Sequence, residues 1–379
     1  MLIPFNKPYL TGKELVYIQE AAANGKLSGD GVFTGKCQRF FEEHYQFRKV
    51  LLTTSCTDAL EMAAILTDIK EGDEVIMPSY TFVSTANAFI LRGAKIVFAD
   101  SRKDHPAVDE ALLEDLITEK TKAIVVVHYA GIACNMDFIQ QLAQKHNLFL
   151  IEDAAQAIDS FYNNKPLGSF GHMAAFSFHE TKNIISGEGG MLVINDERFI
   201  ERAEIIREKG TNRNKFFRGE TDKYNWVDIG SSFLPSEITA AFLWAQIESI
   251  KDIQQRRILL WETYYRLLSP FSDFFELPAM PDYATNNAHA FYLVCKDVNI
   301  RDSLIHLLKS NGILAVFHYL SLHKSPFYAD KHDGRQLPQA DRYSDCLLRL
   351  PLYYELEPDQ IEHSIVHLIS KFIEEHADL

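Results

Sequence analysis

Residues 123–156, AIVVVHYAGIACNMDFIQQLAQKHNLFLIEDAAQ, carry the clearest fold signal in the chain. They begin with an apolar, β-branched run at Ala123–Val127, continue with a helical pattern at Met136–His146 and return to an apolar run at Phe149–Glu152. Apolar strands that lack polar alternation and flank a helix are typical of a parallel sheet buried on both faces. This segment therefore predicts one strand–helix–strand unit of such a sheet.

The same alternation extends from this unit toward the N-terminus. Further strands are predicted at Val50–Thr53, Glu74–Met77 and Lys95–Ala99, and further helices at Asp58–Thr67, Tyr80–Leu91 and Asp109–Ile117. Strands that alternate with helices indicate an α/β fold with a large, mainly parallel sheet. Ligands in such sheets bind at the carboxyl ends of the strands. We therefore expect a functional site in the loops that follow the strands.

The chain before residue 50 has a different pattern. A helical period is followed by a glycine-rich loop that contains Gly29-Asp30-Gly31. A dinucleotide-binding fingerprint requires an apolar strand before its glycines. No such strand precedes Gly29, so we do not expect a dinucleotide site there.

The chain after residue 190 predicts a change of domain. A strand at Met191–Ile194, a helix at Glu197–Lys209, a polar stretch at 210–230 and a long helical pattern from Pro235 to about Leu267 complete the first part. Residues 268–287, rich in Pro, Asn and Asp, form a crossover. The remainder predicts strands at Ala290–Val294 and Leu314–Phe317 and helices at Arg301–Asn311, Ala340–Leu348 and Pro358–Glu375. We expect a large domain over residues 1–267, with an N-terminal arm, and a smaller α/β domain over 268–379.

Composition narrows the class of protein. A chain of 379 residues suits two domains, and 47% hydrophobic with 24% charged residues is ordinary for a globular protein. A net charge of −14 disfavours nucleic-acid binding through a basic field. The five cysteines are widely spaced, which favours neither disulfides nor a metal site. The N-terminus lacks the features of a signal peptide, and no apolar run is long enough to cross a membrane, so we expect a cytoplasmic protein.

Two of the loops at predicted strand ends could hold a flat, phosphorylated ligand. In Thr53–Asp58, the hydroxyl-bearing residues Ser55 and Thr57 flank Cys56 where a helix begins, and a helix N-terminus binds phosphate. Simple capping of the helix by Ser55 or Thr57 explains the same residues. In Pro78–Phe82, Phe82 could lie against a ring, or it could belong to the core.

Two further loops supply a carboxylate and an amine. Glu152 and Asp153 end an apolar strand, and strand alternation sends their side chains to opposite faces. Asp153 could therefore keep a heterocyclic nitrogen protonated, or it could cap the next helix. The segment FSFHETKNIISGEGG (residues 176–190) places Lys182 in a short polar loop between an apolar run and a glycine turn. Taken alone, Lys182 could be an ordinary surface lysine.

Together, a phosphate cradle, a stacking ring, a carboxylate and a lysine are the parts that pyridoxal phosphate chemistry requires. The lysine forms a Schiff base with the cofactor aldehyde. The carboxylate keeps the pyridine nitrogen positively charged, so that the ring accepts electrons from the substrate. The combination predicts a pyridoxal-phosphate enzyme, although each loop alone does not.

Six ordered motifs resemble one family over almost the full chain. They are Pro4–Lys7 with Leu27-Ser28-Gly29; Ser55–Leu60; Pro78–Phe82; Ile151–Gln156; Phe176–Lys182 with Gly187–Gly190; and Leu350–Tyr353. The chain thereby resembles the DegT/DnrJ/EryC1/StrS family of pyridoxal-phosphate-dependent sugar aminotransferases, which have the aspartate-aminotransferase-like fold (fold type I). Within the family, Ser177–Asn183 and Asp228–Glu237 resemble the enzymes that make dTDP-4-amino-4,6-dideoxygalactose.

The resemblance implies roles for individual residues. Lys182 would be the lysine that binds the cofactor covalently, Asp153 would face the pyridine nitrogen, and Gln156 would lie near the ring's phenolic oxygen. Phe82 would stack on the ring. Ser177 would bind the phosphate, together with Ser55, Cys56 and Thr57.

Two positions depart from the family pattern. The family usually has glycine where Cys56 stands, so this backbone is either not left-handed or mildly strained. The family also offers an asparagine from the partner subunit to the phosphate. The aligned residue here is Ser232, with Asn225 close by as the other choice.

The resemblance further implies the reaction and its partners. The enzyme would move an amino group from L-glutamate to C4 of a dTDP-4-keto-6-deoxyhexose, for cell-surface polysaccharides such as lipopolysaccharide and enterobacterial common antigen. Lys182 would act as covalent partner and as general acid and base. The family forms homodimers whose subunits share their active sites. Five residues are candidates for substrate contacts, although solvated loops or core histidines explain them too: Arg213, Lys215, His318, Tyr319 and His323.

Three rival functions remain open at this point. The amino group could be added at sugar C3, or to a sugar on another nucleotide. A dehydratase of the family would carry histidine at the lysine position, and Lys182 argues against it despite the nearby His179. A noncatalytic interaction protein could use the same fold, because a fold does not determine function.

Overall fold

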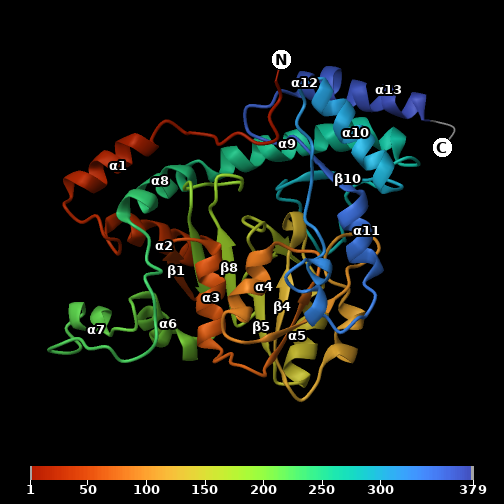
Figure 1. Ribbon diagram of the computed structural model, residues 1–379. Coiled ribbons are helices and arrows are strands. Elements are labelled where there is room, and N and C mark those ends of the chain that lie inside the picture. Colours follow the sequence, from red (N-terminus) through yellow and green to blue (C-terminus); the bar gives the residue numbers. More distant parts are fainter. Residues whose placement is uncertain (1, 377–379) are drawn as a thin grey trace.

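The computed structural model describes residues 2–376, and a seven-stranded sheet lies at its centre (Figure 1). The strand order is β1-β9-β8-β5-β4-β2-β3. Strand β9 runs antiparallel to both of its neighbours, β1 and β8, and the other strand pairs of the sheet are parallel. The predicted mainly parallel sheet is therefore confirmed. Its strands are β1 (Lys49–Thr53), β2 (Glu74–Pro78), β3 (Lys95–Ala99), β4 (Thr121–Val127), β5 (Phe149–Asp153), β8 (Met173–Ser177) and β9 (Gly190–Ile194).

Helices cover both faces of this sheet. Within β1, Val50 and Leu52 pack into the core on one face, whereas Leu51 packs into the core on the other. The first core is closed by α2 (Val32–His44), α5 (Met136–Lys145) and α8 (Glu237–Glu248), and the second by α3 (Cys56–Leu66), α4 (Val83–Ile90) and α6 (Ile200–Arg207). Burial on both faces explains why the strand sequences show so little polar alternation.

Several segments differ from the sequence prediction. The helix expected at Asp109–Ile117 is wrong: two 3₁₀ turns, Glu110–Leu112 and Glu114–Leu116, replace it. The Asp109 carboxylate accepts a hydrogen bond from the Ala111 amide at 3.1 Å, a local bond that competes with a continuous helix. Strand β8 is not among the predicted strands, and it occupies the apolar run that precedes the lysine loop.

Two further differences concern helix ends. The long helix predicted from Pro235 is two helices, α8 and α9 (Ile250–Leu268), which meet at Ser249. The helix predicted at Ala340–Leu348 ends at Cys346, as α11 (Pro338–Cys346), and strand β12 (Leu347–Leu350) follows at once. The run Leu347–Leu350, which is apolar except for Arg349, fits a helix end and a strand equally well, and here sheet pairing prevails.

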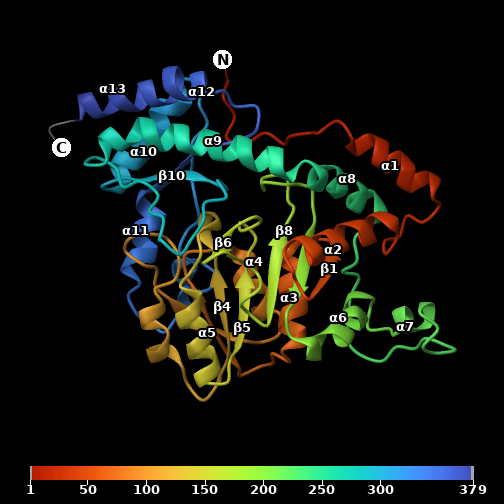
Figure 2. The same ribbon diagram turned by 180° about the vertical axis from the view of Figure 1, so that it is seen from behind.

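The C-terminal part has a sheet and a core of its own. Its antiparallel strands lie in the order β10-β12-β11, with β10 at Phe291–Val294 and β11 at Val316–Phe317. The second half of α9 packs into the same core, and Figure 2 shows α9 running from the large sheet to this part. Because α9 contributes to both regions, the division at residues 267/268 stays a prediction. The remaining elements here are α10 (Val298–Ser310), α12 (Pro358–Gln360), a π-helical turn (Ile361–Val366) and α13 (His367–Glu375).

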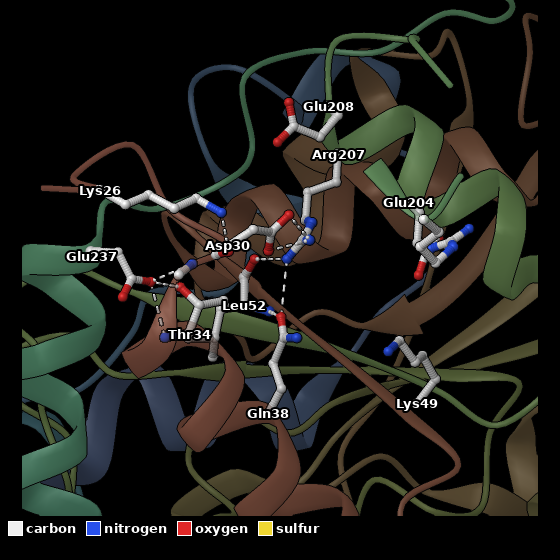
Figure 3. Close-up of polar contacts among 12 residues, drawn as sticks. Lys26, Asp30, Thr34, Gln38, Lys49, Leu52, Glu204, Arg207, Glu208 and Glu237 are labelled. Carbon is white, nitrogen blue, oxygen red and sulfur yellow. Dashed lines mark hydrogen bonds and ion pairs between the residues drawn. The ribbon is translucent and has the colours of Figure 1, made fainter. Parts of the chain in front are cut away.

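The N-terminal segment lies against α8. Helix α1 (Glu14–Ala23) packs on α8, and the glycine-rich loop that follows is held by the anchor cluster, which we define as Asp30, Gln38, Arg207 and Glu237 (Figure 3). Arg207 Nη2 donates to both Asp30 carboxylate oxygens at 2.7 and 2.8 Å, and Arg207 Nη1 donates to Gln38 Oε1 at 3.1 Å. The Glu237 carboxylate accepts from three backbone amides at the start of α2, namely those of Gly31, Phe33 and Thr34.

Candidate active site

A cavity of about 470 Å³ opens at the carboxyl ends of the central parallel strands. The loops after β1, β2 and β8 and the last residue of β5 line it, and β12 closes it from the C-terminal part. This is the place that the parallel topology predicts for a ligand. Its lining includes Ser55, Cys56, Thr57, Phe82, Thr85, Asp153, Gln156, Ser177, Lys182, His318, Tyr319 and Arg349.

Lys182 lies in the loop that joins β8 to β9. Because β9 returns antiparallel to β8, the loop starts and ends at the same edge of the sheet. The Phe178 amide donates to Gly189 O at 2.8 Å and the Ser186 amide donates to Phe178 O at 2.7 Å, which closes the loop behind Lys182. Burial lowers the pKa of the Lys182 amine, and Arg349 adds to that effect, whereas Cys56 and Asp153 oppose it. A lysine with a lowered pKa is a better nucleophile and base at neutral pH.

Asp153 is the acid that faces the cavity. It ends β5 and is buried, and its carboxylate accepts hydrogen bonds from Thr85 Oγ1 at 2.6 Å and from the Ala155 amide at 3.1 Å. Burial raises the pKa of Asp153, whereas these two hydrogen bonds and the nearby Lys182 act in the opposite direction. The arrangement presents a fixed carboxylate to the cavity.

Glu152 points to the opposite face of the sheet, as strand alternation predicts. Its carboxylate accepts from the backbone amides of Gly168, Phe170 and Gly171 at 2.7, 2.8 and 2.6 Å. It also contacts His128 Nε2 at 3.0 Å. Glu152 is fully satisfied there, so of the two adjacent acids only Asp153 faces the cavity.

The N-terminus of α3 forms one wall of the cavity. Ser55 Oγ accepts from the Asp58 amide at 3.0 Å, so Ser55 does cap the helix. Cys56, the first residue of α3, is not among the residues with positive φ. Its backbone is therefore not left-handed, and a side chain at this position causes no strain of that kind. A Cβ added at Gly190 would lie 2.4 Å from the Cys56 amide nitrogen, so β9 can approach the helix start only with glycine there. Free amides at a helix start fit a phosphate group.

Phe82 and Gln156 lie at the sides of the cavity. Phe82 is 54% exposed and lies 5.9 Å from the Tyr319 ring between centroids, so it is not a core residue. Gln156 accepts from the Ala130 amide at 2.6 Å and donates to Tyr319 Oη at 2.9 Å. An exposed aromatic ring at the cavity mouth is free to cover a flat ligand.

The C-terminal part contributes His318, Tyr319 and Arg349. His318 Nδ1 lies 2.7 Å from Tyr129 Oη, and Arg349 Nη1 lies 3.0 Å from His318 Nε2. Since a guanidinium only donates, His318 Nε2 is the acceptor and His318 is neutral. Burial and the charge of Arg349 lower the pKa of His318 well below its ordinary value, which agrees with this assignment.

Four predicted residues lie outside the cavity of their own chain. Ser232 pairs with Glu208 in an isolated bridge. Lys215 forms an ion pair with Glu201 at 2.5 Å. His323 Nδ1 contacts Ser79 Oγ at 2.7 Å beneath the surface. Arg213, in α7 (Arg213–Phe217), lies over the Phe217 ring, and Asn225 is likewise absent from the cavity lining.

Sequence reasoning missed several polar residues of the cavity, among them Thr85 and Arg349. Thr85 holds the Asp153 carboxylate from α4. Arg349 comes from the centre of β12. A signal for Arg349 was available, because a single arginine within the apolar run Leu347–Leu350 is unusual in a buried strand.

The residues of the cavity fit pyridoxal phosphate. Lys182 supplies an amine of lowered pKa, Asp153 a buried carboxylate, and the start of α3 an amide-lined wall that Gly190 leaves open. In residues 2–376 no group of three or more His, Cys, Asp or Glu side chains is placed to bind a metal ion. Across the same residues, no helix is both long and apolar enough to span a membrane.

Comparisons with known proteins agree with this geometry. The family model described as the DegT/DnrJ/EryC1/StrS aminotransferase family matches residues 8–369. PseC of Helicobacter pylori, an aminotransferase of pseudoaminic acid biosynthesis, is 27% identical with a TM-score of 0.90, over 99% of this chain and 100% of that one. DesV of S. venezuelae is 28% identical with a TM-score of 0.89, over 98% and 99%. Spr1654 of Streptococcus pneumoniae, solved in its PLP form, is 25% identical with a TM-score of 0.89, over 98% and 100%.

Proposed function

The chain belongs to the DegT/DnrJ/EryC1/StrS aminotransferase family, and on that premise we propose that it aminates C4 of a dTDP-4-keto-6-deoxyhexose with L-glutamate as donor. The protein is an aminotransferase with the fold type I architecture, and its cofactor is pyridoxal phosphate. The product would be a dTDP-4-amino-4,6-dideoxyhexose of the galacto series. The observation that carries the proposal is the convergence of Lys182, Asp153 and the α3 N-terminus in one cavity.

When bound, pyridoxal phosphate supplies an electron sink for the carbon that loses its proton. Lys182 is the covalent anchor in this proposal, and burial lowers the pKa of its amine. Once released, the neutral amine removes the proton from the donor's α-carbon and later returns a proton to the sugar carbon. Asp153, held by Thr85 and the Ala155 amide, orients and stabilises the protonated ring nitrogen.

Other side chains hold the cofactor in place under this proposal. Ser55, Cys56, Thr57 and Ser177 surround the start of α3, where amides and hydroxyls can bind the phosphate. Phe82 covers one side of the ring from the cavity mouth. Gln156, fixed by Ala130 and Tyr319, lies where the ring's phenolic oxygen would need a donor.

The choice of sugar rests on sequence motifs. Ser177–Asn183 and Asp228–Glu237 resemble the enzymes that act at C4 of dTDP-4-keto-6-deoxyglucose. His318 and Tyr319 are proposed to contact the sugar, because both line the cavity. Amination at C3 of a 3-keto sugar is the alternative, and a product analysis separates the two.

A homodimer is part of the proposal. Helix α1 carries the exposed Leu15 and α7 carries the exposed Phe217, and Figures 1 and 2 show these two helices at the same side of the molecule. Trp226, which pairs with Thr211 in an isolated bridge just before α7, is 82% exposed. Exposed apolar residues gathered on one side mark an interaction surface. A two-fold partner on this side would account for the place of Ser232, Asn225, Arg213 and Lys215, which would then face the partner's cavity.

We place the reaction in the cytoplasm. All five cysteines are free in the structure, and four of them are buried. Thiols that stay unpaired suit a reducing compartment. The nucleotide sugar would be available there as a soluble substrate.

A spectrum is the first test of the proposal. The purified protein is expected to show the visible absorption of a lysine-bound cofactor, and L-glutamate should bleach it. Keto-sugar nucleotides that differ in base and in keto position are then offered to the aminated enzyme, and NMR of the product identifies the carbon that carries nitrogen. Lack of absorption after added pyridoxal phosphate would favour a noncatalytic interaction protein.

A further inference from the structure

A buried polar frame joins the lysine loop to the start of the C-terminal part. We define the polar frame as Asn183, Gln254, Asn287 and His289, all of which are at most 5% exposed. Asn183, which follows Lys182 in the chain, donates through Nδ2 to Gln254 Oε1 at 2.8 Å and to Asn287 O at 2.7 Å. The Asn287 amide donates to two backbone carbonyls of the segment after β5, both at 2.8 Å. The polar frame therefore ties the lysine loop, α9 and the residues before β10 to the large sheet.

The backbone before His289 is strained. Ala288 is fully buried and has a φ of 51°, in the left-handed region that residues other than glycine rarely adopt. The Asn286 side chain accepts from the Ala288 amide at 2.8 Å, and Asn287 Oδ1 accepts from the His289 amide at 3.0 Å. Arg257 donates to the carbonyls of Ala288 and His289 at 3.1 and 2.8 Å. Such strain persists only where the surroundings fix the backbone, and it is concentrated at functional sites.

The polar frame fixes the proton on the His289 ring. Asn287 O is a backbone carbonyl and only accepts, so the Asn183 atom that lies 2.7 Å from it is the amide nitrogen. The Asn183 oxygen therefore faces His289 Nδ1 at 3.0 Å, and Nδ1 carries the proton. Burial and the positive charges of Lys182 and Arg349 hold the pKa of His289 well below its ordinary value, so the ring is neutral. Nε2 then has a lone pair and no proton.

The cavity contains an unused acceptor and an unused donor. His289 lines it, and because the polar frame takes up Nδ1, the ring edge with Nε2 is turned to the cavity. Nε2 has no hydrogen-bond partner among the described residues, whereas His318 uses both ring nitrogens, on Tyr129 and Arg349. The Lys182 amine lines the same cavity and likewise has no hydrogen bond to a described residue. A buried polar group without a partner costs free energy.

We propose that His289 is a positioning residue for Lys182, whose amine donates a hydrogen bond to Nε2 once the cofactor has released it. The two residues share one support, because Asn183 holds the ring and is the chain neighbour of Lys182. A lysine amine sits on a flexible four-carbon stem, and a fixed acceptor narrows the positions that it can take. The proton removed from the substrate carbon stays on the Lys182 amine as an ammonium, and His289 remains neutral and accepts from it.

The inference rests on the proposed aminotransferase function and deepens it. A hydroxyl of the sugar and the ammonium of the amino-acid donor are the other hydrogen-bond donors that could reach Nε2. The sugar takes part only in the second half-reaction and the amino-acid donor only in the first, whereas the Lys182 amine works in both. A loss of rate in both half-reactions, with substrate affinities unchanged, therefore points to Lys182.

Solid-state NMR of holoenzyme labelled with ¹⁵N-histidine tests the ring directly. We expect the His289 ring to be neutral with its proton on Nδ1. His172 provides the opposite case in the same spectrum, because its Nδ1 accepts from the Leu150 amide at 3.0 Å and its proton must lie on Nε2. The His289 signals are those that disappear in the H289Q variant. This measurement does not depend on turnover.

The kinetic test compares H289N with H289Q. Asparagine places its amide at the distance of Nδ1, so it keeps the contact with Asn183 and presents no acceptor where Nε2 lies. Glutamine extends its amide to about the position of Nε2 and retains an acceptor there. H306N, at an exposed position of α10, is the control. Stopped-flow absorbance follows holoenzyme with L-glutamate, and enzyme loaded with pyridoxamine phosphate with the keto-sugar nucleotide.

H289N is expected to slow both half-reactions at saturating substrate by roughly 10- to 100-fold, the scale of one hydrogen bond to a charged group. The dissociation constants of glutamate and of the sugar nucleotide should stay the same. Glutamate deuterated at its α-carbon should give a larger isotope effect in H289N, because a misplaced amine makes proton transfer the slower step. H289Q should recover most of the rate, and H306N should match the wild type. Circular dichroism and the visible absorption of the holoenzyme check folding, and the NMR measurement on the wild type carries the test if H289N does not fold.

Three results would overturn the inference. One is a His289 ring with its proton on Nε2. Another is an H289N enzyme that runs both half-reactions at the wild-type rate. The third is a loss confined to one half-reaction, which would assign Nε2 to the sugar hydroxyl or to the amino-acid donor. A wild-type protein that does not respond to glutamate would instead refute the proposed function and leave the NMR result on His289 in place, so the two failures are distinguishable.

Discussion

The anchor cluster and the cavity both bury charged side chains, but they differ in whether those charges have partners within the fold. In the anchor cluster, Arg207 meets the Asp30 carboxylate and Glu237 meets three backbone amides, so every charge has an opposite charge or dipole within the fold. In the cavity, Lys182 and Arg349 have no ion pair among the described residues. Burying an unpaired charge costs free energy. The anchor cluster is therefore expected to stabilise the fold, whereas the cavity keeps its charges for ligands.

The substitution Lys182→Ala is expected to have the largest effect on activity without lowering stability. Turnover should fall by at least ~10⁴-fold, the scale for removing a nucleophile that also transfers the proton. The urea unfolding midpoint of the apoprotein should stay the same or rise, because an amine with an unfavourable buried charge is removed. Coupled assays of 2-oxoglutarate release and urea titrations measure both, with the exposed Lys251→Ala as control. Near-normal turnover would end the catalytic assignment of Lys182.

The substitution Asp153→Asn tests whether the cavity needs the negative charge of Asp153. The amide keeps the shape of the side chain and removes the negative charge that faces the ring nitrogen, so the glutamate half-reaction should slow by about 10²- to 10³-fold. Stopped-flow absorbance gives the rate. Cofactor content should be nearly unchanged, and a wild-type rate in this variant would show that Asp153 does not face the ring.

Glu237→Ala tests the anchor cluster. The change leaves three backbone amides at the start of α2 without an acceptor, and we expect a loss of about 3 kcal/mol or more in the free energy of unfolding. Urea denaturation followed by circular dichroism measures it, beside the exposed Glu262→Ala. The rate constant for the glutamate half-reaction in the folded fraction should be unchanged. A catalytic defect without a stability loss would reverse the roles assigned to the two clusters.

The pH dependence of covalent cofactor binding is expected to be the smallest of these effects. The rate at which the apoprotein binds pyridoxal phosphate covalently needs the neutral amine, so it should rise with pH through the pKa of Lys182. Because burial lowers that pKa, the midpoint should lie below 10.5, the ordinary lysine value. The unfolded chain binds the extra proton between the two values, so apoprotein stability should also rise with pH across that window. A midpoint at or above 10.5 would contradict the lowered pKa.

Local patterns were enough to predict much of this molecule. Apolar runs without alternation predicted the parallel strands, and the opposite faces of Glu152 and Asp153 follow from strand geometry alone. The shared cavity of Asp153, Phe82 and the Thr53–Asp58 loop follows from the rule that parallel strands end at one edge. These features depend on residues that are close in sequence or on a general rule of topology.

Features that depend on distant partners were not predictable. The apolar run 347–350 became β12 only because β10 and β11 pair with it. Arg349 enters the cavity from almost 170 residues after Lys182, and nothing local shows that its neighbours include no carboxylate. Ser232 and Arg213 lie outside the cavity of their own chain, so their proposed roles depend on a second subunit.

Strand β9 runs back antiparallel to β8, and the register between these two strands positions Lys182. The visible absorption of the bound cofactor therefore reports whether that register is correct. The lysine loop is closed by the pair Ser177↔Gly190, and Gly190 in turn approaches the start of α3. A slip of one residue between β8 and β9 would turn every side chain of the slipped strand to the other face and shift it by about 3.3 Å. Such a chain could be compact and rich in secondary structure yet unable to bring Lys182 to the cofactor. Recovery of the visible absorption during refolding would therefore count correctly registered molecules, where circular dichroism would count all compact ones.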